Sequence, residues 1–153
     1  MSKRVLITGG NKGIGLAVSR AMLEFGYEVI IVARDFDTCP IVGVKNVTAI
    51  EYDLSDVDGL PELAKTVGNI DILINNAGYM QPKYTYNNYP KDAREHIMNV
   101  DLYTPVELMN IFCEHMKKQK YGRIVNTASI AGQIGHPDVW YGIAKAGLIN
   151  ATK

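Results

Sequence analysis

Short apolar runs alternate with amphipathic stretches along this chain, and the alternation restricts the fold more than any other feature. The runs are continuous and rich in β-branched residues, which is typical of parallel strands covered on both faces. They span residues 4–8, 28–33, 47–52, 70–75 and 122–128. Helical patterns separate most of them, so the connections can cross over between parallel neighbours. We expect an α/β fold with a doubly wound, Rossmann-like parallel sheet, its five strands in the order 3-2-1-4-5 and helices on both faces.

The helical patterns fall into four segments. Residues 14–25 carry apolar side chains at helical spacing and end before Gly26. Residues 56–67 predict a second helix, with Ser55 as its N-cap.

A longer helix is predicted from 91 to 118, and Pro105 should kink it. The last helix starts near Val139. Residues 34–46 are too few and too broken by Pro40 and Gly43 for a full helix, and the polar stretch 79–88 predicts a loop.

Composition narrows the function classes. Of the 153 residues, 47% are hydrophobic, and sixteen basic residues balance sixteen acidic ones, which argues against a protein that coats a polyanion. Cys39 and Cys113 are distant from each other, as expected in a reducing compartment. No apolar run approaches the length of a membrane span or a secretory leader. We therefore expect one cytoplasmic domain covering 1–153, without partners among nucleic acids or membranes.

The loop between the first strand and the first helix reads "TGGNKGIG", residues 8–15. Glycine permits a sharp turn and close approach of a phosphate, and a helix N-terminus attracts anions. The first strand–helix turn of a doubly wound sheet is also where a dinucleotide pyrophosphate binds. The glycines do not follow the usual GxGxxG order, yet their position predicts a phosphate site. The residues expected to contact the cofactor here are Gly9, Asn11, Lys12, Gly13, Ile14 and Gly15.

Charges near this loop indicate which dinucleotide binds. An acidic residue after the second strand would hold a ribose 2′-hydroxyl, but the sequence there is Ala33 and Arg34. Arg34 and Lys12 supply two cations where a 2′-phosphate would lie. We expect NADP(H) to be preferred; Asp35, one position further on, leaves NAD(H) possible.

Five motifs in order resemble the classical short-chain dehydrogenase/reductase family. They are "TGGNKGIG", "YDL" at 52–54, "NNAG" at 75–78, "GRIVNTASIAG" at 122–132 and "YGIAK" at 141–145. The resemblance implies that Asp53 and Leu54 contact the adenine and that Asn76, Ala77 and Gly78 line the adenosine side. Family members usually continue with further strands and a substrate lid, so the resemblance implies that this chain lacks those elements.

Tyr141 and Lys145 lie four residues apart on a predicted helix, so their side chains share one face. A neighbouring ammonium stabilises a phenolate, which makes a tyrosine a better proton shuttle. The resemblance assigns Tyr141 as general acid and base, Lys145 as its electrostatic partner and a ligand of the nicotinamide ribose, and Ser129 as the group that positions the substrate carbonyl.

A fourth family position, commonly asparagine, departs from the pattern here. Counting along the chain places Asp101 there, in "NVDL", while Asn99 lies two residues away on another helical face. We expect Asp101 to take the position. The three histidines lack the spacing of a metal cluster, and no metal is expected.

These signals predict an oxidoreductase that interconverts a small-molecule carbonyl and an alcohol by hydride transfer to or from NADP(H). The alternative is an NADP(H)-binding fragment or sensor without turnover. The resemblance further suggests a homo-oligomer that pairs through the helix 91–118 and the helix carrying Tyr141.

Overall fold

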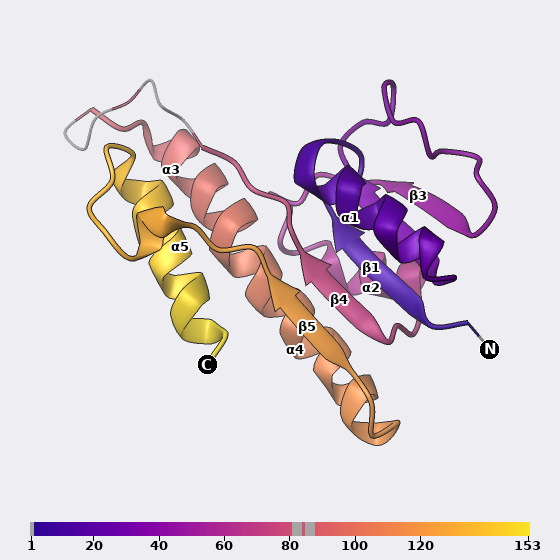
Figure 1. Cartoon of the computed structure of the whole chain (residues 1–153). Coiled ribbons are helices and arrows are strands. Elements are labelled where there is room, and N and C mark those ends of the chain that lie inside the picture. The colour runs from indigo at the N-terminus through magenta and orange to yellow at the C-terminus, as the bar shows by residue number, and fades with distance from the viewer. Residues whose placement is uncertain (1, 81–83, 85–87) are drawn as a thin grey trace.

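Five parallel strands form a single sheet in the computed structural model, which describes residues 2–80, 84 and 88–153. The strands are β1 Arg4–Thr8, β2 Glu28–Ala33, β3 Val47–Glu51, β4 Ile72–Asn75 and β5 Arg123–Asn126. Their order is β3-β2-β1-β4-β5, and every neighbouring pair is parallel (Figure 1). The predicted fold class and strand order are confirmed. Three of the predicted strands were too long: β3 ends one residue early, and β4 and β5 each have four residues.

Burial along the strands explains why their apolar runs are continuous. In β1, Val5, Leu6 and Ile7 are all completely buried, although consecutive side chains point to opposite faces of the sheet. One face packs against α1 (Gly13–Glu24), whose Leu16, Val18 and Met22 join the core on that side. The other packs against α2 (Leu60–Val67) and α4 (Thr104–Lys118). A strand covered on both faces has no place for a polar residue, so alternation is lost.

The second helix begins later than the sequence predicted. α2 starts at Leu60, with Gly59 as an N-cap that makes no side-chain capping bond. The predicted cap, Ser55, instead donates its backbone N–H to Asp53 Oδ1 at 2.9 Å, and Asp56 Oδ1 accepts from Gly59 N at 3.1 Å. Aspartates compete for nearby backbone N–H groups in this way and favour turns over helix.

The predicted long helix is continuous over its expected length but changes its winding. It comprises α3 (Lys91–Met98), the π-helical segment η1 (Asn99–Tyr103) and α4, which ends at Lys118 as expected. In η1 the N–H of Thr104 reaches back five residues to the carbonyl of Asn99. Pro105 follows at once and has no N–H to give to the preceding turn. The predicted irregularity at Pro105 is therefore a widened π turn.

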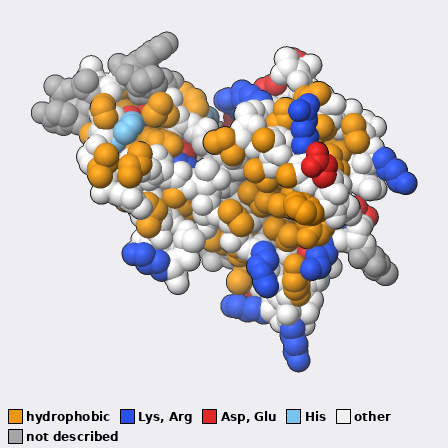
Figure 2. All heavy atoms as spheres, viewed as in Figure 1, with side chains coloured by type: hydrophobic (Ala, Val, Ile, Leu, Met, Phe, Trp, Pro, Cys, Tyr) orange, Lys and Arg blue, Asp and Glu red, His pale blue; other side chains and the backbone are white. Residues whose placement is uncertain are grey.

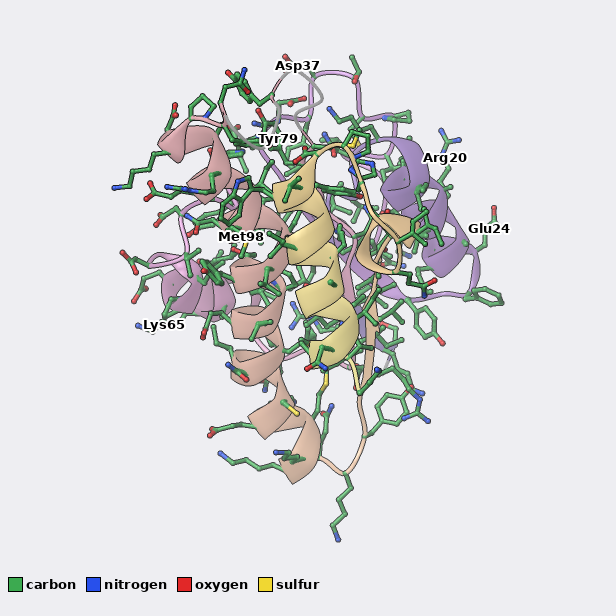
Figure 3. The ribbon with its side chains drawn as sticks, turned by 90° about the vertical axis from the view of Figure 1, so that its left-hand side faces the viewer. Arg20, Glu24, Asp37, Lys65, Tyr79 and Met98 are labelled. Carbon is green, nitrogen blue, oxygen red and sulfur yellow. The ribbon has the colours of Figure 1, made fainter. Side chains whose placement is uncertain are left out.

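The last helix, α5 (Val139–Ala151), begins where it was predicted. It lies alongside α3 and η1, as Figures 1 and 3 show. A single 3-10 turn, η2 (Ile130–Gly132), connects β5 to it. The segment 34–46 contains only turns and bends, as predicted, whereas the predicted loop 79–88 includes residues 81–83 and 85–87, which lie outside the described residues.

Candidate active site

The glycine loop folds back tightly on the end of β1. Gly9 has a positive φ of 66°, and a Cβ on Gly15 would lie 2.0 Å from the carbonyl oxygen of Gly9. No side chain fits in that space, so the helix starts directly against the turn. The first turn of α1 is thereby brought close to the carboxyl end of the sheet.

The N-terminus of α1 lacks the usual features that occupy such an end. Its N-cap, Lys12, makes no side-chain capping bond, and its first turn contains no acidic residue. The first N–H groups of a helix have no partner within the helix, and the helix dipole adds positive potential there. This end of α1 is consequently suited to an anionic ligand.

Hydrogen bonds fix the loop to its neighbours. The buried Asn11 donates from Nδ2 to the carbonyl of Asp35 at 2.9 Å, which ties the loop to the segment after β2. Thr8 Oγ1 accepts from the backbone N–H groups of Asn76 and Ala77, at 3.0 and 3.1 Å. Asn76 donates from Nδ2 to the carbonyl of Thr8 at 3.1 Å. The carboxyl ends of β1, β2 and β4 are therefore held in one arrangement.

A cavity of about 390 Å³ lies at this edge of the sheet. It is lined by twelve of the predicted site residues: Gly9, Asn11, Lys12, Ile14, Gly15, Arg34, Asp53, Leu54, Asn76, Ala77, Gly78 and Tyr141. Four other predicted residues, Gly13, Asp101, Ser129 and Lys145, do not line it. Figure 2 shows one face of the molecule, where hydrophobic side chains gather over the middle of the sheet and most Lys and Arg side chains lie nearer the edges.

Charges of both signs stand at the end of the cavity near β2. Lys12 and Arg34 are exposed cations on its wall, and the exposed Asp35 lies beside them. Asp53 lies on the same wall, and the Ser55 N–H bonded to its carboxylate lowers the pKa of that carboxyl. This end therefore contains two cations and two carboxyl groups.

The sequence did not identify nine of the residues that line the cavity. They are Val32, Ala33, Asp35, Tyr52, Tyr79, Met80, His96, Val100 and Thr127. Several of them end or follow strands, where the carboxyl-edge rule for open α/β sheets could have placed them. His96 and Val100 belong to the long helix, and no local pattern shows which of its faces approaches the sheet.

Tyr141 and Lys145 meet on one face of α5, as predicted. Lys145 Nζ lies 5.6 Å from the centre of the Tyr141 ring. Lys145 is only 2% exposed, and its Nζ donates to the carbonyl of Thr127, just after β5, at 3.0 Å. The ammonium lies behind the ring rather than on the cavity wall.

Asp101 forms an ion pair with Lys145. Its Oδ1 lies 3.0 Å from Nζ, and its Oδ2 accepts from the backbone N–H of Tyr79 at 2.9 Å. Asp101 is fully buried, which raises the pKa of its carboxyl, and the nearby Lys145 ammonium opposes that rise. Asn99, the alternative from the sequence, donates instead to the carbonyl of Ser55 at 2.9 Å, away from Lys145.

Ser129 lies at the turn after β5 and caps η2. Its Oγ accepts from the backbone N–H of Ala131 at 3.2 Å. A serine hydroxyl that accepts one bond still has its own proton to donate. Ser129 does not line the cavity.

The start of α5 is anchored by a buried carboxylate. Asp138, 2% exposed, is the N-cap and accepts from the backbone N–H of Tyr141 at 3.1 Å. Tyr89, just before α3, donates its hydroxyl to the other oxygen of Asp138 at 3.3 Å. Burial, together with the negative charge of Asp138, raises the pKa of Tyr89. The ring of His136 stands 5.6 Å from that of Tyr141.

Among the described residues, no group of three or more His, Cys, Asp and Glu side chains is arranged to hold a metal ion. No helix formed by them has both the length and the apolar character that crossing a membrane requires.

Comparisons with known proteins match this geometry. A family model described as short chain dehydrogenase matches residues 3–153. Ketoacyl reductase HetN of Nostoc sp. is 36% identical over 162 residues, which cover 98% of this chain and 56% of that protein. Acetoacetyl-CoA reductase of Shinella zoogloeoides is 32% identical over 160 residues, covering 100% of this chain and 66% of the relative. The chain thus spans less than two thirds of the length of these relatives.

Solved structures that superpose closely on this chain include dehydrogenases and short-chain oxidoreductases. A 4-hydroxyisoleucine dehydrogenase complexed with NADH superposes with a TM-score of 0.91 at 28% identity, covering 99% of this chain and 65% of that one. A metagenomic short-chain oxidoreductase in complex with NADP superposes with a TM-score of 0.87 at 26% identity, covering 97% and 71%.

Proposed function

The chain belongs to the short-chain dehydrogenase family, and from that premise we propose that it is an NADP(H)-dependent oxidoreductase that interconverts a carbonyl and an alcohol by hydride transfer. One observation carries the proposal. A single cavity extends from the glycine loop, with Lys12 and Arg34 on its wall, to Tyr141, and Lys145 lies directly behind that phenol.

The residues present fit a dinucleotide. The uncapped N-terminus of α1 would take the pyrophosphate, and the tight turn at Gly9 and Gly15 keeps side chains out of its path. Asp53, Leu54, Asn76, Ala77 and Gly78 would line the adenosine side. The remaining glycine-loop contacts would come from Asn11, Gly13 and Ile14. Bound nicotinamide would supply or accept the hydride.

The preference for NADP(H) rests on the two cations near β2. Arginine can place a forked pair of N–H groups on a phosphate, and lysine adds a point charge. Related structures contain NADH in one case and NADP in another, so family membership leaves the choice open. Asp35 on the same wall is the feature that would favour NAD(H).

The protein's own groups would handle the proton. Tyr141 would give its hydroxyl proton to the substrate oxygen in reduction and take it back in oxidation. Ser129 would donate its hydroxyl proton in a hydrogen bond to that oxygen and hold it in line. That proton is available because the bond from the Ala131 N–H uses only a lone pair of Oγ. Lys145 and Asp101 would set the electrostatic environment of the phenol. The predicted contact of Lys145 with the nicotinamide ribose would use the third ammonium proton, although Lys145 does not line the cavity in this structure.

The test is carbonyl-dependent consumption of NADPH, followed by absorbance, with a panel of small carbonyl compounds. The panel should include acetoacetyl-CoA, since one relative is named as its reductase. Turnover that is faster with NADPH than with NADH supports the proposal. Failure of every carbonyl and every alcohol, in a protein that binds NADPH, would contradict it.

A second candidate is an NADP(H)-binding protein without turnover. It is favoured by the burial of Lys145 and its pairing with Asp101, which reduce the positive charge available to Tyr141.

We also propose a cytoplasmic homo-oligomer that pairs through α3, α4 and α5. Ile143 on α5, 45% exposed, and Tyr103 at the end of η1, 48% exposed, are side chains that such a contact would cover.

A further inference from the structure

Asp101 and Lys145 form a buried ion pair beside Tyr141. An ammonium has three N–H groups. One of those on Lys145 is given to the carbonyl of Thr127 at 3.0 Å, and Asp101 Oδ1 lies 3.0 Å away on another side. With the two side chains 0% and 3% exposed, water cannot screen either charge. The pair therefore acts on its surroundings as a dipole rather than as a free cation.

Within the described part of the chain, few charged or hydrogen-bonding groups face Asp101. From α5 it faces Lys145, and Asp138 at the start of that helix adds a second negative charge. From the segment after β4 it receives the backbone N–H of Tyr79. A Cβ on Gly78 would lie 3.1 Å from Asp101 Oδ1 and 3.7 Å from Lys145 Nζ, so the backbone closes that side. On η1 itself, Asp101 is the one charged residue, and the phenol of Tyr103 is half exposed.

We propose that Asp101 is a positioning residue that pairs with the Lys145 ammonium, so that Tyr141 serves more readily as a proton donor than as a proton acceptor and the site favours carbonyl reduction over alcohol oxidation. The proposal rests on the proposed function. In reduction, reduced nicotinamide would supply the hydride to the substrate carbon, Tyr141 would give its proton to the substrate oxygen, and solvent would then return a proton to Tyr141. Oxidation needs the phenolate at the outset, and a neutralised ammonium does little to stabilise it.

The substitution Asp101→Asn tests the electrostatic part without any substrate. The amide oxygen can still accept from Tyr79, but the charge is gone and the second position becomes an N–H₂ group facing Nζ. The ionisation of Tyr141 is followed by the ultraviolet absorbance of tyrosinate, as the difference between each protein and its Tyr141→Phe counterpart. In Asp101→Asn we expect Tyr141 to ionise about 1 pH unit or more lower than in the unsubstituted protein.

Two further variants make the result decisive. Asp92→Asn, the same change on an exposed residue of α3, should leave the titration unmoved. If Asp101→Asn does not fold, Asp101→Ser removes the charge in a smaller side chain and should shift the titration in the same direction. An unchanged titration of Tyr141 in the folded variant would overturn the inference.

Turnover separates this inference from the proposed function. Where activity is found, the alkaline limb for reduction and the rising limb for oxidation should both move to lower pH in Asp101→Asn. A titration shift in a protein that turns over no carbonyl would leave the charge pairing standing and contradict the proposed function. Turnover of a carbonyl with pH profiles that are the same in Asp101→Asn as in the unsubstituted protein would support the proposed function and contradict this inference.

Discussion

At the residue scale, the proposed preference for NADP(H) depends most on Arg34. It extends from the end of β2 onto the cavity wall. A hydrogen bond to a charged group contributes about 1.5–3 kcal/mol. We therefore expect Arg34→Ala to weaken NADPH binding about 10- to 150-fold and to change NADH binding little. Fluorescence titration with both cofactors measures this.

The matched control is Arg20→Ala, an exposed arginine of α1 that does not line the cavity. Its affinities for both cofactors should stay unchanged. Equal losses of NADPH and NADH affinity in Arg34→Ala would show that the residue does not read a 2′-phosphate.

Tyr141 lies on the cavity wall and its hydroxyl is the proposed proton donor. Tyr141→Phe keeps the ring and its packing but removes that proton. Turnover should be abolished, while NADPH binding should remain within a few fold of the original. Retained turnover in a steady-state assay would remove Tyr141 from the mechanism.

Asp53 provides a prediction about pH. The backbone N–H of Ser55 lowers the pKa of its carboxyl below the ordinary value of 3.8. A carboxyl with a depressed pKa stabilises the folded state at pH values above its unfolded pKa, and that contribution is lost as the pH falls through the folded pKa. The Asp53→Asn variant should thus be less stable than the original at neutral pH, and the difference should shrink in acid. Urea denaturation at both pH values is the check, and a difference independent of pH would contradict it.

Single residues were easiest to predict where a motif fixes their position relative to a strand or a helix. The Tyr141–Lys145 spacing and the glycine loop are of this kind. The pairing of Asp101 with Lys145 was not predicted, because it depends on how η1 and α5 pack against each other. A sequence separation of 44 residues contains no information on a 3.0 Å contact.

At the scale of elements, sequence patterns predicted most helices and strands but not the first residue of each. α2 begins four residues late, and the segment before it forms turns in which Asp53 and Asp56 accept from the backbone N–H groups of Ser55 and Gly59. The π turn in η1 was expected only as a kink, since proline shows that a bond is missing and not how the chain compensates.

Asp138 sets where α5 begins. Its carboxylate caps the helix at the N–H of Tyr141 and also accepts from Tyr89. Loss of a cap costs about 0.5–2 kcal/mol, so Asp138→Ala should lower the free energy of unfolding by about that amount. Asp138→Ser, which can still cap, should recover part of it. Urea denaturation gives both values, and an unchanged Asp138→Ala variant would show that the cap is not needed.

At the scale of the whole molecule, β5 lies at one edge of the sheet and, among the described strands, pairs with β4 alone. Val125 on it is 50% exposed. An exposed apolar edge strand favours pairing between copies. We expect the 153-residue chain to self-associate, and Val125→Lys to reduce the association, as measured by size-exclusion chromatography with light scattering.

Phe25→Ser is the matched control, because Phe25 is 75% exposed but lies at the end of α1, away from the edge strand. It should leave association unchanged. If the unsubstituted protein is a monodisperse monomer, β5 does not mediate association between copies of the chain.

The π turn at η1 also determines which changes of length the molecule tolerates. A π turn is an α-helix that has taken in one extra residue within a single widened turn, while the helix on either side keeps its rotation. Removing one residue from 99–103 would therefore let the helix run on as a regular α-helix, with Tyr89 still beside Asp138 and His96 still on the cavity wall. Removing one residue from the regular helix α4 would instead rotate everything before it by about 100° around the helix axis. We expect the shorter chain to tolerate a deletion in η1 far better than a deletion in α4.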